Sequence, residues 1–168
     1  PKVTYYDETY SVIVWEDYRN TTSDIYASFF DINGDYPTTF SENGNPVVAD
    51  GADISQKAPR VKSTSDGAIV TWFDYRNGDV DLYIQKITHE SGNNWINNDT
   101  PTEFTYDGLY VSTAGETAQL DPASRLTDDG QGGVYIVWQS FLGSDTDIYI
   151  QHFDSEGNIS FTENSLLI

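Results

Sequence analysis

The chain repeats one pattern of residues three times, and this repetition limits the folds open to it more than any other feature. A run of apolar residues ends in tryptophan, an aspartate follows nine residues later, and a tyrosine comes two residues after that. The tryptophans are Trp15, Trp72 and Trp138, the aspartates are Asp24, Asp81 and Asp147, and the tyrosines are Tyr26, Tyr83 and Tyr149. Repetition over this length is the signature of repeat architectures, so each copy should form the same small structure.

Three such units account for the whole chain, as residues 1–58, 59–121 and 122–168 of a single domain over 1–168. A proline opens each unit, at Pro1, Pro59 and Pro122, and the units close on the similar segments GNPVV, DGLYV and ENSLLI. The second unit is longer because it carries extra residues around NNDTPTEFTYDG.

Each unit is expected to form four short strands. The second strand is the apolar run SVIVW, AIVTW or VYIVW, and the third begins IYASFF, LYIQKI or IYIQHF. Strands without a polar side indicate a sheet that is covered on both faces, and helical periodicity is nowhere sustained. The sequence therefore predicts an all-β fold, a β-propeller built of four-stranded antiparallel blades. A β-sandwich is the competing architecture, but it gives no reason for three copies of one pattern.

The order of the repeated residues resembles a known family. An apolar run followed by Trp-x-Asp-x-Arg, a short turn and Asp-Ile/Leu-Tyr resembles the TolB-type β-propeller repeats of secreted and cell-surface proteins of bacteria and archaea. The matching residues are Trp15, Asp17, Arg19, Asp24, Ile25 and Tyr26, then Trp72, Asp74, Arg76, Asp81, Leu82 and Tyr83, and in the third unit only Trp138, Asp147, Ile148 and Tyr149. The resemblance implies a propeller and an extracellular or cell-surface location, but propellers host many activities.

The polar residues of the repeat favour a structural role. Side chains alternate along a strand, so Asp17 and Arg19 should lie on one side, where the guanidinium could bond both Asp17 and Asp24 and fix the hairpin. The third unit has Ser140 and Leu142 instead, so both partners are lost together. The alternative is a pair of catalytic carboxylates of the glycosidase type. Because an active site normally occurs once per domain, we predict no catalytic residue and a protein that is not an enzyme.

Two further segments are candidates for ligand binding. Residues 31–42, DINGDYPTTFSE, resemble a calcium loop whose ligands would be Asp31, Asn33, Asp35 and Glu42, although the glycine falls one place early. Calcium is the one cofactor that the sequence suggests, and solvated turn carboxylates are the alternative.

Trp95, beside an Asn-rich loop, could stack on a sugar or fill space in the propeller. The two histidines, His89 and His152, suggest neither a metal site nor a Ser–His–Asp triad.

Charge limits the partners of the chain. It has 27 acidic and 8 basic residues, a formal net charge of −19, which repels phosphate backbones and anionic membranes. No apolar stretch is long enough to insert into a membrane, and the absence of cysteine excludes a disulfide framework. We expect neither nucleic acid nor membrane insertion.

The number of repeats indicates a partner of another kind. Propellers usually close with four to eight blades, so three would leave two apolar blade faces uncovered. We expect either part of a larger ring, completed by further blades of a longer chain, or half of a six-bladed dimer. The function that follows is a non-enzymatic module for adhesion, protein–protein interaction or assembly. The alternatives are a glycan-binding, lectin-like propeller and a glycoside hydrolase.

Overall fold

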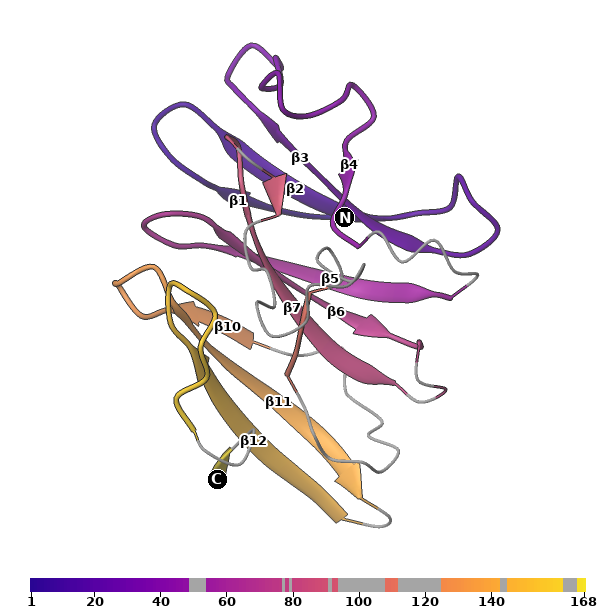
Figure 1. Ribbon diagram of the computed structural model, residues 1–168, viewed down its shortest axis with the longest axis vertical. Helices are drawn as coiled ribbons and strands as arrows, with labels where there is room; N and C mark the ends of the chain where they lie inside the picture. The colour runs from indigo at the N-terminus through magenta and orange to yellow at the C-terminus, as the bar shows by residue number, and fades with distance from the viewer. Residues whose placement is uncertain are drawn as a thin grey trace.

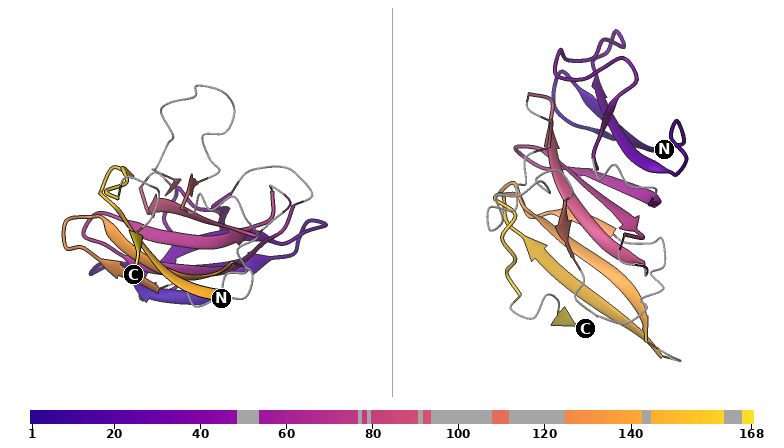
Figure 2. Two further views of the ribbon diagram at one scale, coloured as in Figure 1. Left: turned by 90° about the horizontal axis from the view of Figure 1, so that it is seen from below. Right: turned by 45° about the vertical axis from the view of Figure 1, so that its right-hand side comes forward.

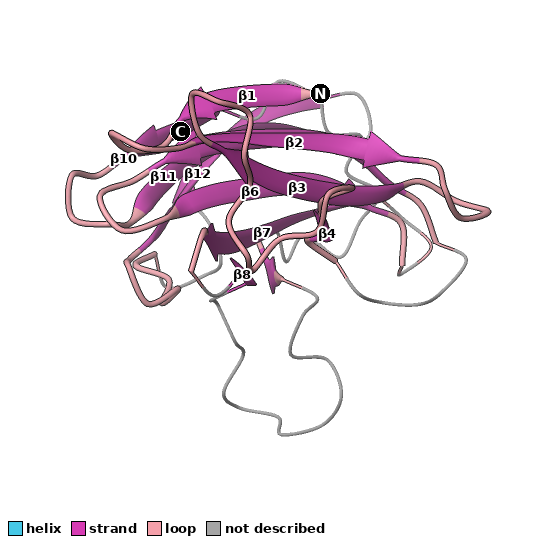
Figure 3. Cartoon of the chain, turned by 90° about the horizontal axis from the view of Figure 1, so that it is seen from above, coloured by secondary structure: helices cyan, strands magenta, loops and turns pink. Residues whose placement is uncertain are grey.

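The structure is a computed structural model that describes residues 1–48, 54–76, 78, 80–90, 92–93, 108–111, 125–142, 145–161 and 166–168. These residues lie in strands, turns and loops, and there is no helix among them (Figure 3). The predicted all-β fold class is therefore confirmed. Within the same residues, nothing forms a helix that could cross a membrane.

The strands form three antiparallel sheets, each from one continuous part of the chain. The first contains β1 (Lys2–Tyr5), β2 (Ser11–Asp17), β3 (Asp24–Phe30) and β4 (Asn45–Pro46). The second contains β5 (Gln56–Ser63), β6 (Ala68–Asp74), β7 (Asp81–Thr88), β8 (Gly92–Asn93) and β9 (Leu109–Tyr110). The third contains β10 (Arg125–Asp128), β11 (Val134–Leu142), β12 (Asp145–Phe153) and β13 (Leu166–Leu167). Within each sheet the strands are ordered as in the sequence, except that β8 and β9 both pair with β7.

The first and third sheets have the four strands expected, and the second differs. There, two short strands take the position of the fourth strand. β8 pairs with the last two residues of β7, and β9 pairs with Tyr83 and Ile84 of the same strand. The second sheet also begins earlier than the repeat suggests, since β5 starts at Gln56 and contains Pro59. An irregularity in the pairing of β5 with β6, between Lys57 and Arg60, accommodates this proline.

The three sheets share one register, which shows that the sequence repeat is a structural repeat. The repeated tryptophan of the second strand lies opposite the repeated tyrosine of the third, in the pairs Trp15–Tyr26, Trp72–Tyr83 and Trp138–Tyr149. Two residues further along, the cross-strand pairs are Asp17–Asp24, Asp74–Asp81 and Ser140–Asp147. Because side chains alternate along a strand, each tryptophan shares a sheet face with the residue two places after it.

The sheets stack face to face in chain order, as the views in Figures 1 and 2 show. One apolar core lies between the first and second sheets, and a second core lies between the second and third. Every residue of β6 is buried, because the middle sheet is covered on both faces. This is the environment that strands without a polar side predict. The first strands also lie side by side, with β5 in contact with β1 and with β10.

The second and third sheets each present their repeated tryptophan to the sheet before them. Trp72 belongs to the first core, with Val12 and Val14 of the first sheet, and Trp138 belongs to the second core, with Leu82 of the second sheet. We call the face that carries this tryptophan the Trp face and the other the opposite face. Both internal interfaces are therefore of one kind, the opposite face of one sheet against the Trp face of the next.

Candidate functional site

The polar residues that follow the repeated tryptophan form a compact cluster in the first sheet. Arg19 holds Asp17 with two parallel bonds, Nε to Oδ1 at 2.7 Å and Nη2 to Oδ2 at 2.6 Å. The indole N–H of Trp15 donates to the same carboxylate at 2.9 Å. The Arg19 guanidinium also lies 4.0 Å from the centre of the Tyr26 ring and donates to the carbonyl of Asn43. The two-pronged geometry is the strong form of an arginine–carboxylate pair.

The second sheet repeats the ion pair, the indole bond and the arginine–tyrosine contact of this cluster. Arg76 donates to Asp74 from Nε at 2.8 Å and from Nη2 at 2.5 Å, Trp72 donates to Asp74 at 3.0 Å, and the guanidinium lies 4.1 Å from the centre of the Tyr83 ring. Here Asp74 is fully buried, because the first sheet covers the cluster. A buried carboxylate needs such partners to offset the loss of its hydration.

In the first sheet, the second carboxylate of the hairpin has a different partner from the one predicted. Arg19 uses its donors on Asp17 and Asn43, and Asp24 instead accepts a bond of 2.7 Å from Asn20. The prediction that one guanidinium joins both carboxylates is therefore wrong in the first sheet. The reason is geometric, since two oxygens of one carboxylate already match the arginine fork. In the second sheet, Asp81 accepts a bond from the Tyr110 hydroxyl at 3.1 Å.

Electrostatics support a fixed charge pair at this cluster. The hydrogen bond from Arg19, opposed by burial and assisted by the indole N–H of Trp15, holds the pKa of Asp17 well below its usual range. At Tyr110, burial first and Asp81 second raise the pKa above that of a free phenol. Asp17 is thus a stable anion rather than a group that exchanges protons near neutral pH.

The third sheet lacks the ion pair but keeps the ring pair. Trp138 and Tyr149 stack at 5.8 Å between ring centres, as Trp72 and Tyr83 do at 6.0 Å. Ser140, in the place of the aspartate, is buried, and its hydroxyl finds no partner among the described residues. The tryptophan–tyrosine pair is therefore the common element of the three sheets, and the charged residues are an addition in two of them. Asp147 keeps its register position opposite Ser140.

A glycine beneath the tryptophan completes the cluster, and sequence reasoning missed its role. A Cβ atom on Gly44 would lie 2.3 Å from the ring of Trp15, and one on Gly108 would lie 2.4 Å from the ring of Trp72. Both glycines have positive φ, +75° and +74°, which side chains disfavour. Both glycines stand in the closing segments GNPVV and DGLYV of the sequence. Only the structure shows that the indole ring occupies the space where a side chain would lie.

The predicted calcium loop is held together by its own aspartate. Asp31 Oδ1 accepts bonds from the backbone N–H of Asn33 at 2.8 Å and of Asp35 at 2.9 Å, and Asn33 Nδ2 donates to the other carboxylate oxygen at 3.1 Å. Glu42 is exposed. Within the described part of the chain, no group of three or more His, Cys, Asp or Glu side chains is arranged to hold a metal. Calcium binding stays a prediction, and Asp31 has a structural role without it.

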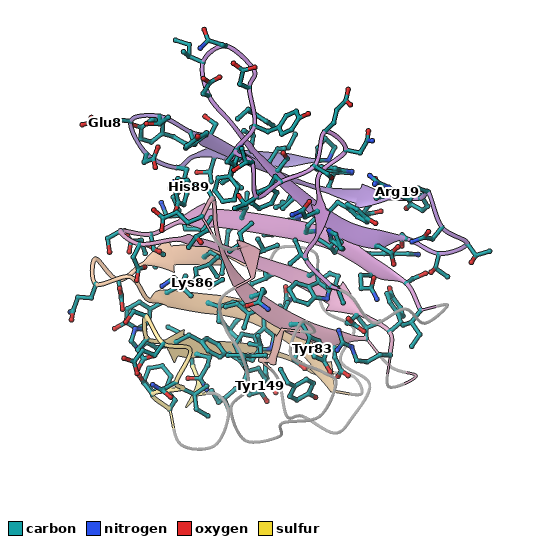
Figure 4. All side chains as sticks on the ribbon, turned by 45° about the horizontal axis from the view of Figure 1, so that its top comes forward. Glu8, Arg19, Tyr83, Lys86, His89 and Tyr149 are labelled. Atoms are coloured by element: carbon teal, nitrogen blue, oxygen red, sulfur yellow. The ribbon has the colours of Figure 1, made fainter. Side chains whose placement is uncertain are left out.

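The structure assembles one polar chain that the sequence did not indicate. His152 Nδ1 lies 2.7 Å from the hydroxyl oxygen of Ser160, and His152 Nε2 lies 2.8 Å from Asp129 Oδ2. The second sheet has an ion pair at the equivalent position, between Lys86 and Asp66 at 2.7 Å. Figure 4 shows Lys86 toward the end of the strands away from Arg19. Lys86 occupies the position of His152 and makes the same kind of contact to an aspartate, but without a hydroxyl partner. We therefore interpret both contacts as structural bonds that hold a turn against the third strand of its sheet.

Of the remaining residues singled out from the sequence, His89 can be placed and Trp95 cannot. His89 packs among aromatic rings, with centres at 5.5 Å from Tyr6 and 4.9 Å from Tyr10, and so contributes to the first core (Figure 4). Trp95, the predicted sugar-stacking residue, lies outside the described residues.

The two ends of the stack expose residues whose counterparts are buried inside it. On the opposite face of the third sheet, Ile148 is 39% exposed and Ile150 is partly exposed, whereas their first-sheet equivalents Ile25 and Ala27 are 0% and 1% exposed. On the Trp face of the first sheet, Val3 is 66% exposed. Its equivalents Val61 and Leu126 pack against the two cores.

Comparisons with protein-family models, with curated proteins and with solved structures find no match to this chain. The resemblance to TolB-type repeats therefore stays a prediction from the residues named above.

Proposed function

We propose that the chain is a three-bladed part of a β-propeller and acts as a non-enzymatic assembly module, at the cell surface or outside the cell, whose partner is a second copy of itself. The observation that carries this proposal is the match between the two ends of the stack. One end presents a Trp face and the other presents an opposite face, and these are the two surfaces that meet at both internal interfaces. Two copies joined head to tail would form a six-bladed ring, within the usual size of propellers.

The residues at the two ends are suited to burial. The Trp face of the first sheet carries Val3, Tyr5, Ile13 and Trp15, and the opposite face of the third sheet carries Tyr135, Val137, Ile148 and Ile150. All eight side chains are uncharged, although the chain has a net charge of −19 and Arg125, opposite Val137, lies beside the second group. Large uncharged patches on an acidic protein are typical of interaction surfaces. Two carboxylates lie beside the first patch: Asp17 is paired with Arg19, and Asp24, opposite Asp17, accepts a bond from Asn20.

The geometry of the polar cluster favours this function over hydrolysis. A glycosidase needs one carboxylic acid that can donate a proton and one free carboxylate. Asp17 and Asp74 are each engaged by an arginine fork and an indole N–H, so neither is a free carboxylate, and the bond from Arg19 also holds the pKa of Asp17 below its usual range. The same arrangement occurs in two sheets, which supports a role in folding.

Chemical crosslinking tests the head-to-tail arrangement directly. The chain contains no cysteine, so Ile13→Cys labels only the Trp face of the first sheet and Ile150→Cys labels only the opposite face of the third. A short bis-maleimide reagent should crosslink the two variants when they are mixed, while each variant alone should stay uncrosslinked.

Two results of this experiment would refute the proposal. Crosslinked dimers of one variant alone would show a symmetric contact between like faces. No crosslinking in the mixture, at micromolar concentration and with each variant folded by circular dichroism, would show that the two ends do not meet.

A further inference from the structure

A pocket of about 520 Å³ lies between the first and second sheets, where their first strands come together. The first sheet contributes Pro1 and Lys2 from the start of the chain, Glu16 from the end of β2 and Tyr18 from the turn that follows. The second sheet contributes Ala58, Pro59 and Arg60, from the irregular part of β5. This volume is in the range of small-molecule sites in proteins. The pocket belongs to an internal interface, so it is separate from the two ends of the stack.

A basic residue recurs at one register position of the first strand in every sheet. Lys2, Arg60 and Arg125 lie opposite Val14, Thr71 and Val137, each of which directly precedes the repeated tryptophan. These three are among only eight basic residues in the chain. Lys2 and Arg60 both line the pocket, so two of the three cations meet at one site. On a protein with a net charge of −19, this is a local positive region that attracts an anionic group.

Glu16 gives the pocket a fixed acceptor close to these cations. Its Oε2 accepts a bond from the Tyr18 hydroxyl at 2.7 Å and its Oε1 accepts one from the backbone N–H of Ala58 at 2.8 Å. Burial opposes the charge, but these bonds and the nearby Lys57 keep the pKa of Glu16 below its ordinary value. Each carboxylate oxygen retains a lone pair, so Glu16 can accept another bond from a ligand donor.

The backbone at the pocket wall is unusual. Ala58 has a φ of +53°, the one positive value at a non-glycine residue in the part of the chain that the structure describes. It lies where the pairing of β5 and β6 shifts register, and Arg60 Nη1 donates to the carbonyl oxygen of Pro59 at 3.0 Å. Strained backbone and bulges are often found at binding sites. Here the irregularity directs Ala58 N–H at Glu16 and holds the Arg60 guanidinium at the wall.

We propose that this pocket binds a small molecule in which a carboxylate stands next to hydroxyl or ammonium donors. Lys2 and Arg60 bind the carboxylate, and Glu16 accepts from the neighbouring donors. The Tyr18 ring, 65% exposed, covers the apolar side of the ligand. Both an acidic sugar and an amino acid have this chemistry, and they differ in the donor, which is a hydroxyl in one and an ammonium in the other.

Binding is measured by NMR titration with D-glucuronate and with L-glutamine, and with D-glucose as the uncharged control. We expect saturable binding of at least one of the two carboxylates, and none of glucose. Arg60→Gln and Lys2→Gln should each weaken the binding about tenfold, because each removes a charged bond to the carboxylate. Arg125→Gln changes the same repeat position in the third sheet, which does not line the pocket, and should leave the dissociation constant within about twofold.

Three results would overturn the inference. The first is no saturable binding of either carboxylate at millimolar concentration. The second is equal weakening by Arg60→Gln and Arg125→Gln, which would indicate general attraction to basic residues. The third is equal binding of D-glucose. Lys2 is exposed, so Lys2→Gln should fold. This variant therefore tests the inference even if Arg60→Gln fails to fold. The outcome does not depend on whether two copies of the chain associate.

Discussion

At the scale of single residues, the structure explains why two charged positions of the repeat change together. In the second sheet Asp74 is buried with its arginine, while the third sheet has Ser140 and Leu142 at the same positions. Removing one partner of a buried pair leaves an uncompensated charge, but removing both leaves none. The third sheet is therefore a natural double variant, in which the tryptophan–tyrosine stack remains without the ion pair.

A double-mutant cycle at the buried pair measures this dependence. Arg76→Leu leaves the Asp74 carboxylate buried without its main partner and should lower the free energy of unfolding by about 3 kcal/mol or more. The double variant Asp74→Ser with Arg76→Leu reproduces the third sheet. It should cost less than the sum of the two single changes, by about 1 kcal/mol or more in urea denaturation. Additive effects would show that the two side chains act independently.

Acid should destabilise the protein through Asp17. Its pKa is lower in the folded chain than in the unfolded one, because Arg19 bonds its charged form. The stabilisation is therefore complete above the ordinary aspartate pKa of about 3.9 and is lost as pH falls below that value toward the folded pKa. Urea denaturation between neutral pH and pH 3 should show a steeper loss of stability for the natural chain than for Asp17→Asn. Parallel curves would argue against this role of Asp17.

At the scale of the elements, a glycine directly before the last strand of the first and of the second sheet, Gly44 before β4 and Gly108 before β9, sets how closely that strand approaches the tryptophan. Gly44 and Gly108 lie against the indole rings and also near carbonyl oxygens of the third strand, 2.8 Å from where a Cβ would be. The carbonyl belongs to the paired backbone and cannot move as a side chain can. The fourth strand therefore depends on the absence of a side chain at this position.

Substitution of this glycine should be far more harmful than substitution of a turn glycine. Gly108→Ala combines a disfavoured φ with contact to Trp72 and to the Ile84 carbonyl, and should destabilise the protein by about 3 kcal/mol or more. Gly34→Ala is the matched control, because Gly34 has a φ of +87° but nothing within 4 Å of a Cβ. It should cost about 1 kcal/mol. Thermal unfolding of both variants decides the point, and equal losses would contradict the packing explanation.

The elements also show how far the sequence predicts the structure. The repeat of Trp15, Trp72 and Trp138 was sufficient to predict three sheets, their all-β class and the strand that carries each tryptophan. The division of the fourth strand in the second sheet was not predictable, because β8 and β9 are two residues long and show no alternation. The contact of His152 with Asp129 and the pocket at Ala58 arise from tertiary pairing and a local bulge. Neither leaves a periodic signal in the sequence.

At the scale of the whole molecule, the middle sheet is the reference for the other two. It has a neighbour on each face, and its strands β6 and β7 are buried almost throughout. Among the described residues, nothing covers the Trp face of the first sheet or the opposite face of the third. Further blades with the same pattern would complete both faces with the same type of contact, and a head-to-tail second copy, as we propose, would supply them.

Salt should strengthen this association. Two copies with a net charge of −19 each repel one another over long distances, and added salt screens that repulsion while it leaves apolar burial intact. The dissociation constant of the dimer should therefore fall as sodium chloride is raised from 20 to 300 mM, a range chosen to shorten the Debye length from about 20 Å to about 6 Å. Weaker association at high salt would indicate a contact made by ion pairs instead of apolar faces.

The mass of the particle in solution shows whether two copies of the chain associate. Sedimentation equilibrium at micromolar concentration should give twice the 18.8 kDa mass of one chain, and Ile148→Asp, which places a charge on the exposed face of the third sheet, should return it to the mass of one chain with its β content unchanged. A natural chain that stays at 18.8 kDa across this concentration range and at every salt concentration would contradict the account.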